Sequence, residues 1–64
     1  MKTKKEITLR AALAAFFISS RYHDQAVSAS WAERGVGAAT AEGFRLSTMA
    51  ANLGHRLRAE GEAL

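Results

Sequence analysis

The stretch WAERGVGAATAEGF, residues 31–44, holds the one clear break in a chain of 64 residues. Gly35 and Gly37 lie at its centre, between two segments that contain good helix formers. A glycine just past the last turn is a common helix end, and a cation such as Arg34 in that turn interacts favourably with the helix dipole. We therefore expect one helix to end at Arg34 and a second helix to start near Ala38.

The segments on either side of this turn both favour helix. The chain has no Pro, is rich in Ala, and contains few β-branched residues, which never alternate with polar residues over the length of a strand. Residues 3–34 and 38–64 form segments of similar length, so the two segments can pair antiparallel. The sequence therefore predicts an all-α protein that forms a helical hairpin.

The position of the turn also predicts a register for the hairpin. If the hairpin is centred on Val36, residues that lie equally far from Val36 in the sequence face each other. This register places Ser20 opposite Asn52 and His23 opposite Met49. The polar patches of the two helices then coincide near the middle of the hairpin.

The first predicted helix has a clear start and an ambiguous middle. Thr3 and Glu6 have the form of a capping box, which predicts that the helix begins at Lys4. The middle is polar near residues 20–24 and allows two interpretations: one continuous helix, or a break after which a short second helix starts at Asp24. This segment contains no Gly or Pro, which favours the continuous helix.

The second predicted helix runs from Ala38 to about Glu60, with Gly61 as its stop. Small residues line one side of this helix at steps of three and four positions. Because glycine inside a helix costs about 1 kcal/mol relative to alanine, two glycines on one side indicate that another backbone comes close there. The residues of this stripe are Gly43, Ser47, Ala50 and Gly54.

The length of the chain limits the core that it can build. Residues 1–64 form one domain, and a chain this short buries only about 60% of its unfolded surface. It has no Cys, so no disulfide can staple it. We therefore expect two copies to pair as a small helical bundle. The residues predicted to pack the helices or the dimer are Leu46, Ala50, Leu53, Gly54 and Leu57.

The net charge of +3 comes entirely from a basic N-terminal arm, residues 1–10. Such an arm either solubilises the chain or meets phosphates or an acidic protein surface. Trp31 is expected in the core or at the dimer seam; the alternative is that it anchors a partner protein, since Trp is frequent in binding hot spots. The residues predicted to contact a partner are Lys2, Lys4, Lys5, Arg10 and Trp31.

Residues 31–44 also resemble the turn of a helix-turn-helix, but two features count against this interpretation. The position four residues before the turn glycine should be small, and here it is Trp31. The first turns of the second helix, residues 38–43, offer only Thr40 as a side chain that could hydrogen-bond a base edge. DNA binding is therefore the second interpretation rather than the first.

No residue pattern indicates an enzyme. His23 and His55 lie too far apart in the predicted hairpin to share a metal ion, and so small a chain has little room for a substrate cavity. We expect no cofactor and no metal. The apolar run at residues 11–18 is shorter than the roughly 20 residues that span a bilayer, and the charges around it argue against a signal peptide. With no Cys, the sequence favours a cytoplasmic protein.

The function that the sequence favours is binding. We expect a non-enzymatic regulatory or inhibitory protein that acts by protein–protein interaction as a homodimer, of a kind that a phage or plasmid could use against a host defence. The alternative is a helix-turn-helix-like DNA-binding transcriptional regulator.

Overall fold

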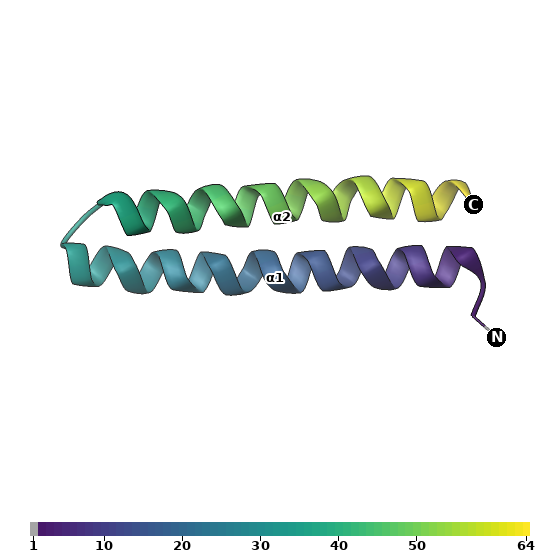
Figure 1. Ribbon diagram of the computed structural model, residues 1–64, viewed down its shortest axis with the longest axis horizontal. Coiled ribbons are helices and arrows are strands. Elements are labelled where there is room, and N and C mark those ends of the chain that lie inside the picture. Colours follow the sequence, from purple (N-terminus) through teal and green to yellow (C-terminus); the bar gives the residue numbers. More distant parts are fainter. Residues whose placement is uncertain (1) are drawn as a thin grey trace.

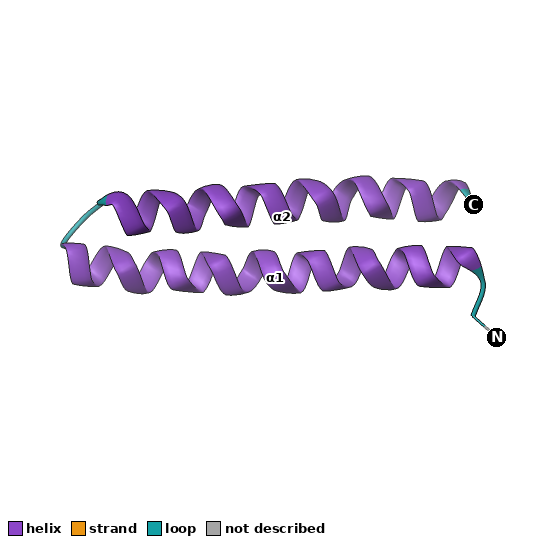
Figure 2. Cartoon of the chain, viewed as in Figure 1, coloured by secondary structure: helices purple, strands orange, loops and turns teal. Residues whose placement is uncertain are grey.

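The chain folds into two long antiparallel helices joined by a short turn (Figure 1). The computed structural model describes residues 2–64. Helix α1 spans Lys4–Glu33 and helix α2 spans Ala38–Ala63. Together they form a flat rod of 48 × 17 × 10 Å, and the described residues contain no strand (Figure 2). The predicted all-α helical hairpin is confirmed.

Helix α1 runs without a break through residues 20–24. Its start is capped by Thr3, whose Oγ1 accepts a hydrogen bond of 3.2 Å from the Glu6 N–H. Near its middle, the Ser19 hydroxyl donates to the Ser47 carbonyl oxygen of α2 at 2.8 Å. The polar side chain that lies between the helices therefore has a partner, and the helix continues past it.

The turn differs from the predicted turn by one residue. Helix α1 ends at Glu33, and Arg34 takes the left-handed conformation, with φ 55° and ψ 47°. Gly35 follows with φ 138°, and its N–H donates to the Ser30 carbonyl oxygen at 2.9 Å. The prediction that α1 ends at Arg34 is therefore wrong by one position. The reversal starts early because the Glu33 carboxylate binds the first free N–H groups of α2.

The interface between the helices is built from the smallest side chains. A Cβ placed on Gly43 would lie 2.8 Å from Ala26 Cβ and 3.0 Å from Ala26 Cα, so a second backbone comes close at this part of the stripe. Hydrophobic stabilisation scales with apolar area, and alanine and glycine bury little of it. The buried residues are Ala12, Ala15 and Ala26 of α1 and Thr40, Gly43, Gly54 and Gly61 of α2.

Helix α2 does not stop at Gly61, as the sequence predicts, but continues to Ala63. Gly61 is buried against α1, where an added Cβ would lie 2.7 Å from Leu9 Cδ2. The glycine therefore serves close packing at this end of the rod rather than helix termination. A helix-internal glycine that faces a neighbour has the same sequence signature as a helix stop near a chain end.

The register of the hairpin also differs from the prediction. Ser19, rather than Ser20, forms the polar contact with α2, and its partner is Ser47 rather than Asn52. His23 lies beside Phe44, with ring centroids 5.4 Å apart, and not beside Met49. Counting residues outward from the turn does not predict the contacts, because only about one side chain per helical turn faces the other helix. The close fit of the small residues, and not the centre of the turn, sets the pairing.

Candidate interaction surface

The large apolar side chains lie outside the intramolecular core. The only buried hydrophobic residues among residues 2–64 are three alanines. The exposed large residues have exposed fractions from 38% at Phe44 to 81% at Trp31. They are Ile7, Leu13, Phe17, Ile18, Val27, Trp31, Val36, Phe44, Met49, Leu53 and Leu64. Large apolar side chains exposed on this scale make the outside of the rod a candidate interaction surface.

The total accessible area supports the same conclusion. The chain exposes 4800 Å², whereas a compact monomer of 6.9 kDa exposes about 4,000 Å². The excess is about 800 Å², which equals the area that one partner contributes to a standard stable interface. The isolated hairpin therefore exposes more surface than a compact chain of its mass, by roughly one partner's share of an interface.

One side of the hairpin carries two aromatic contacts between the helices. Phe16 and His55 meet edge to face, with ring centroids 5.0 Å apart and an interplanar angle of 74°. His23 and Phe44 make the same kind of contact at 69°. Each helix supplies one phenylalanine and one histidine, so each histidine packs on a ring of the opposite helix. Such pairs contribute roughly 0.5–1.5 kcal/mol beyond their burial.

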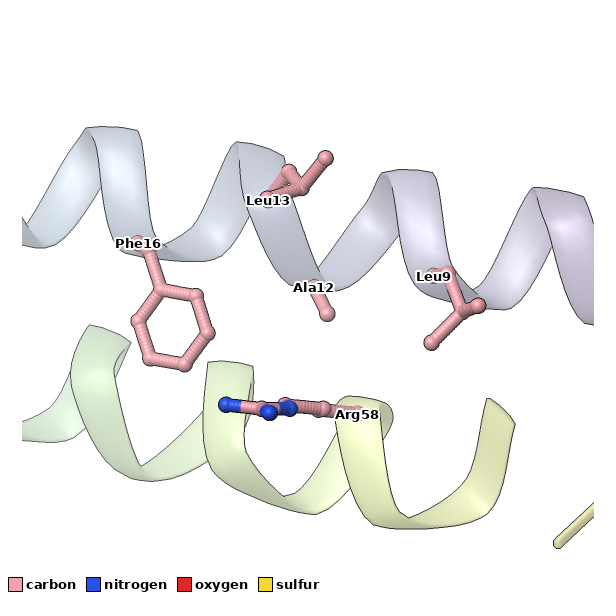
Figure 3. A pocket seen from close by; sticks show the side chains of 5 residues that line it. All are labelled: Leu9, Ala12, Leu13, Phe16 and Arg58. Atoms are coloured by element: carbon pink, nitrogen blue, oxygen red, sulfur yellow. The ribbon is translucent and has the colours of Figure 1, made fainter. Parts of the chain in front are cut away.

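Seven-residue steps extend this side along the whole rod, because positions seven apart lie on the same side of a packed helix. Leu9, Phe16 and His23 form one such series. At the open end, Leu9 and Phe16 point toward α2, Leu13 points away from it, and Arg58 lies across from them (Figure 3). We call this side the aromatic face. It comprises Leu9, Leu13, Phe16, Ser20, His23 and Val27 of α1 and Phe44, Thr48, Ala51 and His55 of α2.

None of these ten residues is Asp, Glu, Lys or Arg, but one cation lies beside them: Arg58 lines the same hollow as Leu9, Leu13 and Phe16. The Arg58 side chain is 64% exposed and donates to Glu62 Oε1 at 3.0 Å. Arg34 lies at the turn end, directly after α1. The aromatic face is therefore mostly uncharged, with one arginine beside it and another at the turn end.

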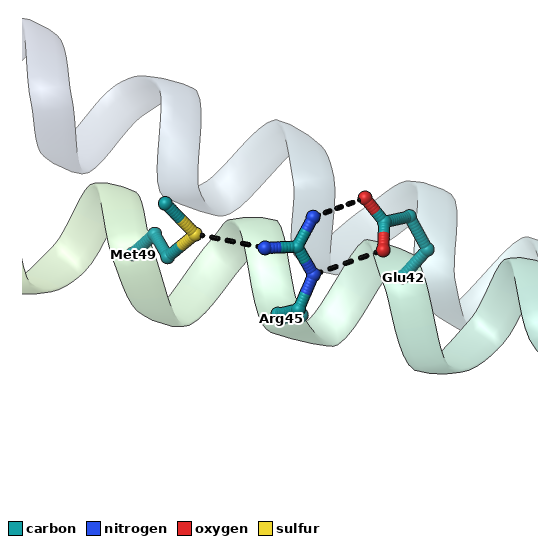
Figure 4. Close-up of polar contacts among 3 residues, drawn as sticks. All are labelled: Glu42, Arg45 and Met49. Atoms are coloured by element: carbon teal, nitrogen blue, oxygen red, sulfur yellow. Dashed lines mark hydrogen bonds and ion pairs between the residues drawn. The ribbon is translucent and has the colours of Figure 1, made fainter.

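The opposite flank of the rod mixes apolar and charged residues. Arg45 donates to both carboxylate oxygens of Glu42, at 2.9 and 2.5 Å, and to Met49 Sδ at 3.2 Å (Figure 4). The Arg45 hydrogen bonds and charge lower the pKa of Glu42. Arg21 lies over the Phe17 ring, 5.9 Å from its centroid. We call this side the charged flank; it comprises Ile7, Phe17, Ile18 and Arg21 of α1 and Glu42, Arg45, Leu46, Met49, Leu53 and Arg56 of α2.

A polar site at the turn ties the two helices together. Gly37, the N-cap of α2, has no side chain to bind the first N–H groups of that helix. The Glu33 carboxylate binds them instead: it accepts from the Ala39 N–H at 3.2 Å and from the Thr40 N–H at 2.9 Å. The fully buried Thr40 hydroxyl adds a third bond, at 2.6 Å. Both Thr40 bonds lower the pKa of Glu33, so the site holds the carboxylate in its charged form.

Stability should depend on pH through this site. The folded pKa of Glu33 lies below its ordinary value of 4.5. Its contribution to folding is therefore complete above that value and is lost as pH falls through the folded pKa. We expect Glu33→Gln to melt at a lower temperature than the wild type at pH 7, and the gap to narrow as the pH falls below 4.5 toward the folded pKa. Thermal melts of both proteins at each pH measure it; a gap that does not change with pH would contradict the assignment.

The structure places the residues predicted to contact a partner at two separate ends. Lys2 precedes α1, whereas Lys4, Lys5 and Arg10 lie within it, all exposed at the open end of the rod. Trp31 lies near the turn and is 81% exposed, which excludes the core of the hairpin; its other predicted place, the dimer seam, stays a prediction. The open end and the turn end are at opposite ends of the rod (Figure 1). One compact ligand could not contact both.

The residues predicted to pack the helices divide into three groups. Gly54 is buried, and an added Cβ there would lie 2.8 Å from the Phe16 ring. Leu46, Ala50 and Leu57 are half-buried. Leu53 is 43% exposed and lies on the charged flank, outside the intramolecular interface.

Sequence reasoning missed the two phenylalanine–histidine contacts and the capping role of Glu33. The seven-residue spacing of Leu9, Phe16 and His23 was a usable signal for the phenylalanine–histidine contacts. No signal in the sequence pointed to Glu33, because a carboxylate at the end of one helix caps the next only when the turn has the right shape.

The geometry of the histidines and of the turn also bears on metal binding and on DNA binding. His23 and His55 pack on different phenylalanine rings, and no group of three or more potential metal ligands occurs within residues 2–64. The two helices lie side by side and antiparallel, whereas those of a helix-turn-helix cross at about 90–120°. Neither described helix is long and apolar enough to cross a membrane. Comparison with protein-family models, with curated protein sequences and with solved structures finds no match to this chain.

Proposed function

We propose that this chain is a small non-enzymatic regulatory or inhibitory protein that acts by protein–protein interaction as a homodimer. The supporting observation is its inverted distribution of side chains: small residues fill the space between the helices, and large apolar residues cover the outside. A core of alanines alone gives little hydrophobic stabilisation. The outer apolar residues therefore have to be covered by other protein surfaces, and the flat rod offers two sides for this purpose.

Two features outside the aromatic face suit contact with a target protein. Trp31 presents most of its ring to solvent, and tryptophan contributes strongly to binding when a partner covers it. The exposed cations at the start of α1 carry the whole net charge and attract an acidic surface. Because these features lie at opposite ends of the rod, the target is either long or bound at one end only.

The test is capture from a lysate of the native host on the immobilised wild-type protein. Trp31→Ala and the double variant Lys4→Gln with Lys5→Gln serve as matched baits, because all three positions are exposed and the hairpin does not need them. We expect one host protein to bind the wild type reproducibly and to be lost from at least one of the two variants. Equal capture by all three baits would refute the assignment of these contacts.

A gel shift with duplex DNA near physiological salt separates the alternative, a DNA-binding regulator. The exposed surface at the start of α2 is mostly alanine, whereas base readout uses Arg, Lys, Asn or Gln. We therefore expect weak, salt-sensitive binding without sequence preference, which comes from the cations at the open end. A sequence-selective complex at nanomolar concentration would replace the proposed function with the alternative.

A further inference from the structure

We propose that the aromatic face is the surface on which a second copy of this chain docks, antiparallel to the first, to form a four-helix bundle. This inference rests on the proposed function, because it assigns the face through which that homodimer forms. Three observations carry it: the area of the face, its low charge compared with the charged flank, and the position of the net charge along the rod.

The area fits a second copy of the same rod. A flat side of 48 by 17 Å offers about 800 Å², which is what each partner contributes to a standard stable interface. A second hairpin has the same length and width and covers this side from end to end. Two helix pairs packed face to face form a four-helix bundle, in which the side chains between the layers become the core.

The distribution of charge selects the aromatic face over the charged flank. Docking on the charged flank would bury the Glu42–Arg45 pair and the Arg21 guanidinium, whose desolvation is costly. The aromatic face presents phenylalanine, leucine, valine and histidine along its length, with Arg58 as the one charged side chain beside it and Arg34 at the turn end. A twofold axis uses the same patch on both copies, and Arg58 lies beside Leu13 rather than near the middle of the face, so an antiparallel pair keeps the two Arg58 side chains apart.

The net charge fixes the direction of the second copy. All of the +3 lies in the first ten residues, at the open end of the rod. A parallel pair would bring the two basic ends together. An antiparallel pair separates them by about the 48 Å length of the rod, far beyond the screening length of about 8 Å at physiological salt. The twofold axis then passes near the middle of α1, close to Ser20.

Ser20 provides a sharp test, because it is exposed in the hairpin but lies near the axis of the proposed dimer. Ser20→Glu would place two carboxylates close together against apolar side chains, so we expect the dimer dissociation constant to rise at least about tenfold. Ser28→Glu is the matched control: it makes the same change on the same helix, at another exposed serine outside the aromatic face, and should leave the constant within about twofold. Ser20→Leu should tighten the dimer.

Sedimentation equilibrium from micromolar to hundreds of micromolar protein measures all four proteins, with circular dichroism to confirm that each remains helical. Misfolding could weaken the dimer of Ser20→Glu without any effect at the interface. Ser20→Leu is expected to strengthen the dimer, and misfolding cannot cause that result. A helical wild type that stays monomeric over this range would overturn the proposal, even if it binds vesicles or another protein. A dimer that Ser28→Glu breaks and Ser20→Glu does not would also overturn it.

The direction is tested by cysteine cross-linking, which is clean because the chain has no Cys. Leu13 and Val27 lie on the aromatic face, each seven residues from Ser20. In the antiparallel dimer, Leu13→Cys of one copy lies near Val27→Cys of another, so mixing the two variants under mild oxidation should give the mixed disulfide dimer in excess. A mixed disulfide dimer that does not exceed the dimers formed by either variant alone would overturn the antiparallel direction. Both experiments use purified protein alone, so they can fail while target capture from the lysate succeeds. Target capture can likewise fail while both experiments confirm the dimer.

Discussion

Gly43→Leu should destabilise the hairpin strongly, and more than the same substitution at Gly54. Gly43 is buried, and even a Cβ at this position would lie 2.8 Å from Ala26 Cβ, 3.0 Å from Ala26 Cα and 3.1 Å from Ala26 N. Two of these three atoms belong to the α1 backbone and cannot rotate away, so the helices must separate. Overpacking typically costs about 1–3 kcal/mol, and a backbone contact places this change at the upper end.

The measurement is the melting temperature at a fixed protein concentration, since pairing of copies makes it concentration-dependent. A loss of about 3 kcal/mol lowers the melting temperature of a domain this small by roughly 12–24 °C. Ala41→Leu is the control, because Ala41 is exposed on the same helix and its helix propensity changes little. An unchanged or raised melting temperature for Gly43→Leu would show that the helices do not approach each other closely at Ala26.

Gly54→Leu offers an instructive comparison. Here the nearest atoms belong to the Phe16 ring, at 2.8–3.0 Å, and a ring at the end of a side chain can rotate away. Helix propensity favours the leucine by up to about 1 kcal/mol. We therefore expect a smaller loss at Gly54 than at Gly43, together with disruption of the contact between Phe16 and His55. The comparison separates the closeness of the backbones from the packing of the aromatic face.

Composition and spacing predicted the architecture because both depend on local rules. Two glycines in a chain that otherwise favours helix allow one reversal, and the Thr3–Glu6 pattern locates the start of α1. The small residues of α2 indicated that another backbone comes close, since glycine inside a helix is unfavourable without such a reason. These features depend on neighbours in the sequence, and the structure has all of them.

The register and the aromatic contacts could not be predicted in the same way, because they depend on how two surfaces fit. His23 meets Phe44 rather than Met49 because the small residues at Ala26 and Gly43 fix the relative positions of the helices. A hydrophobic pattern also cannot distinguish an intramolecular core from a surface that another molecule covers. Trp31 looked like a core residue for this reason, although the hairpin leaves it exposed.

Gly35→Ala should also lower stability clearly, through backbone strain alone. Gly35 has φ 138°, which residues with a side chain rarely adopt, and nothing lies within 4 Å of an added Cβ. No new contact can therefore account for the effect. Residues held in sparsely populated conformations cost about 1–3 kcal/mol, so we expect the melting temperature to fall by at least about 4 °C.

The neighbouring position supplies the matched control, because Arg34 also has positive φ but carries a side chain. Its left-handed conformation, with φ 55°, costs an L-residue roughly 1–2 kcal/mol, which glycine avoids. Two smaller effects oppose this gain: glycine adds entropy to the unfolded chain, and the substitution removes a cation from the end of α1. Arg34→Gly should therefore leave the melting temperature unchanged or raise it slightly. If Gly35→Ala were tolerated and Arg34→Gly destabilised the protein, the reversal would depend on the Arg34 side chain and not on the two backbone conformations.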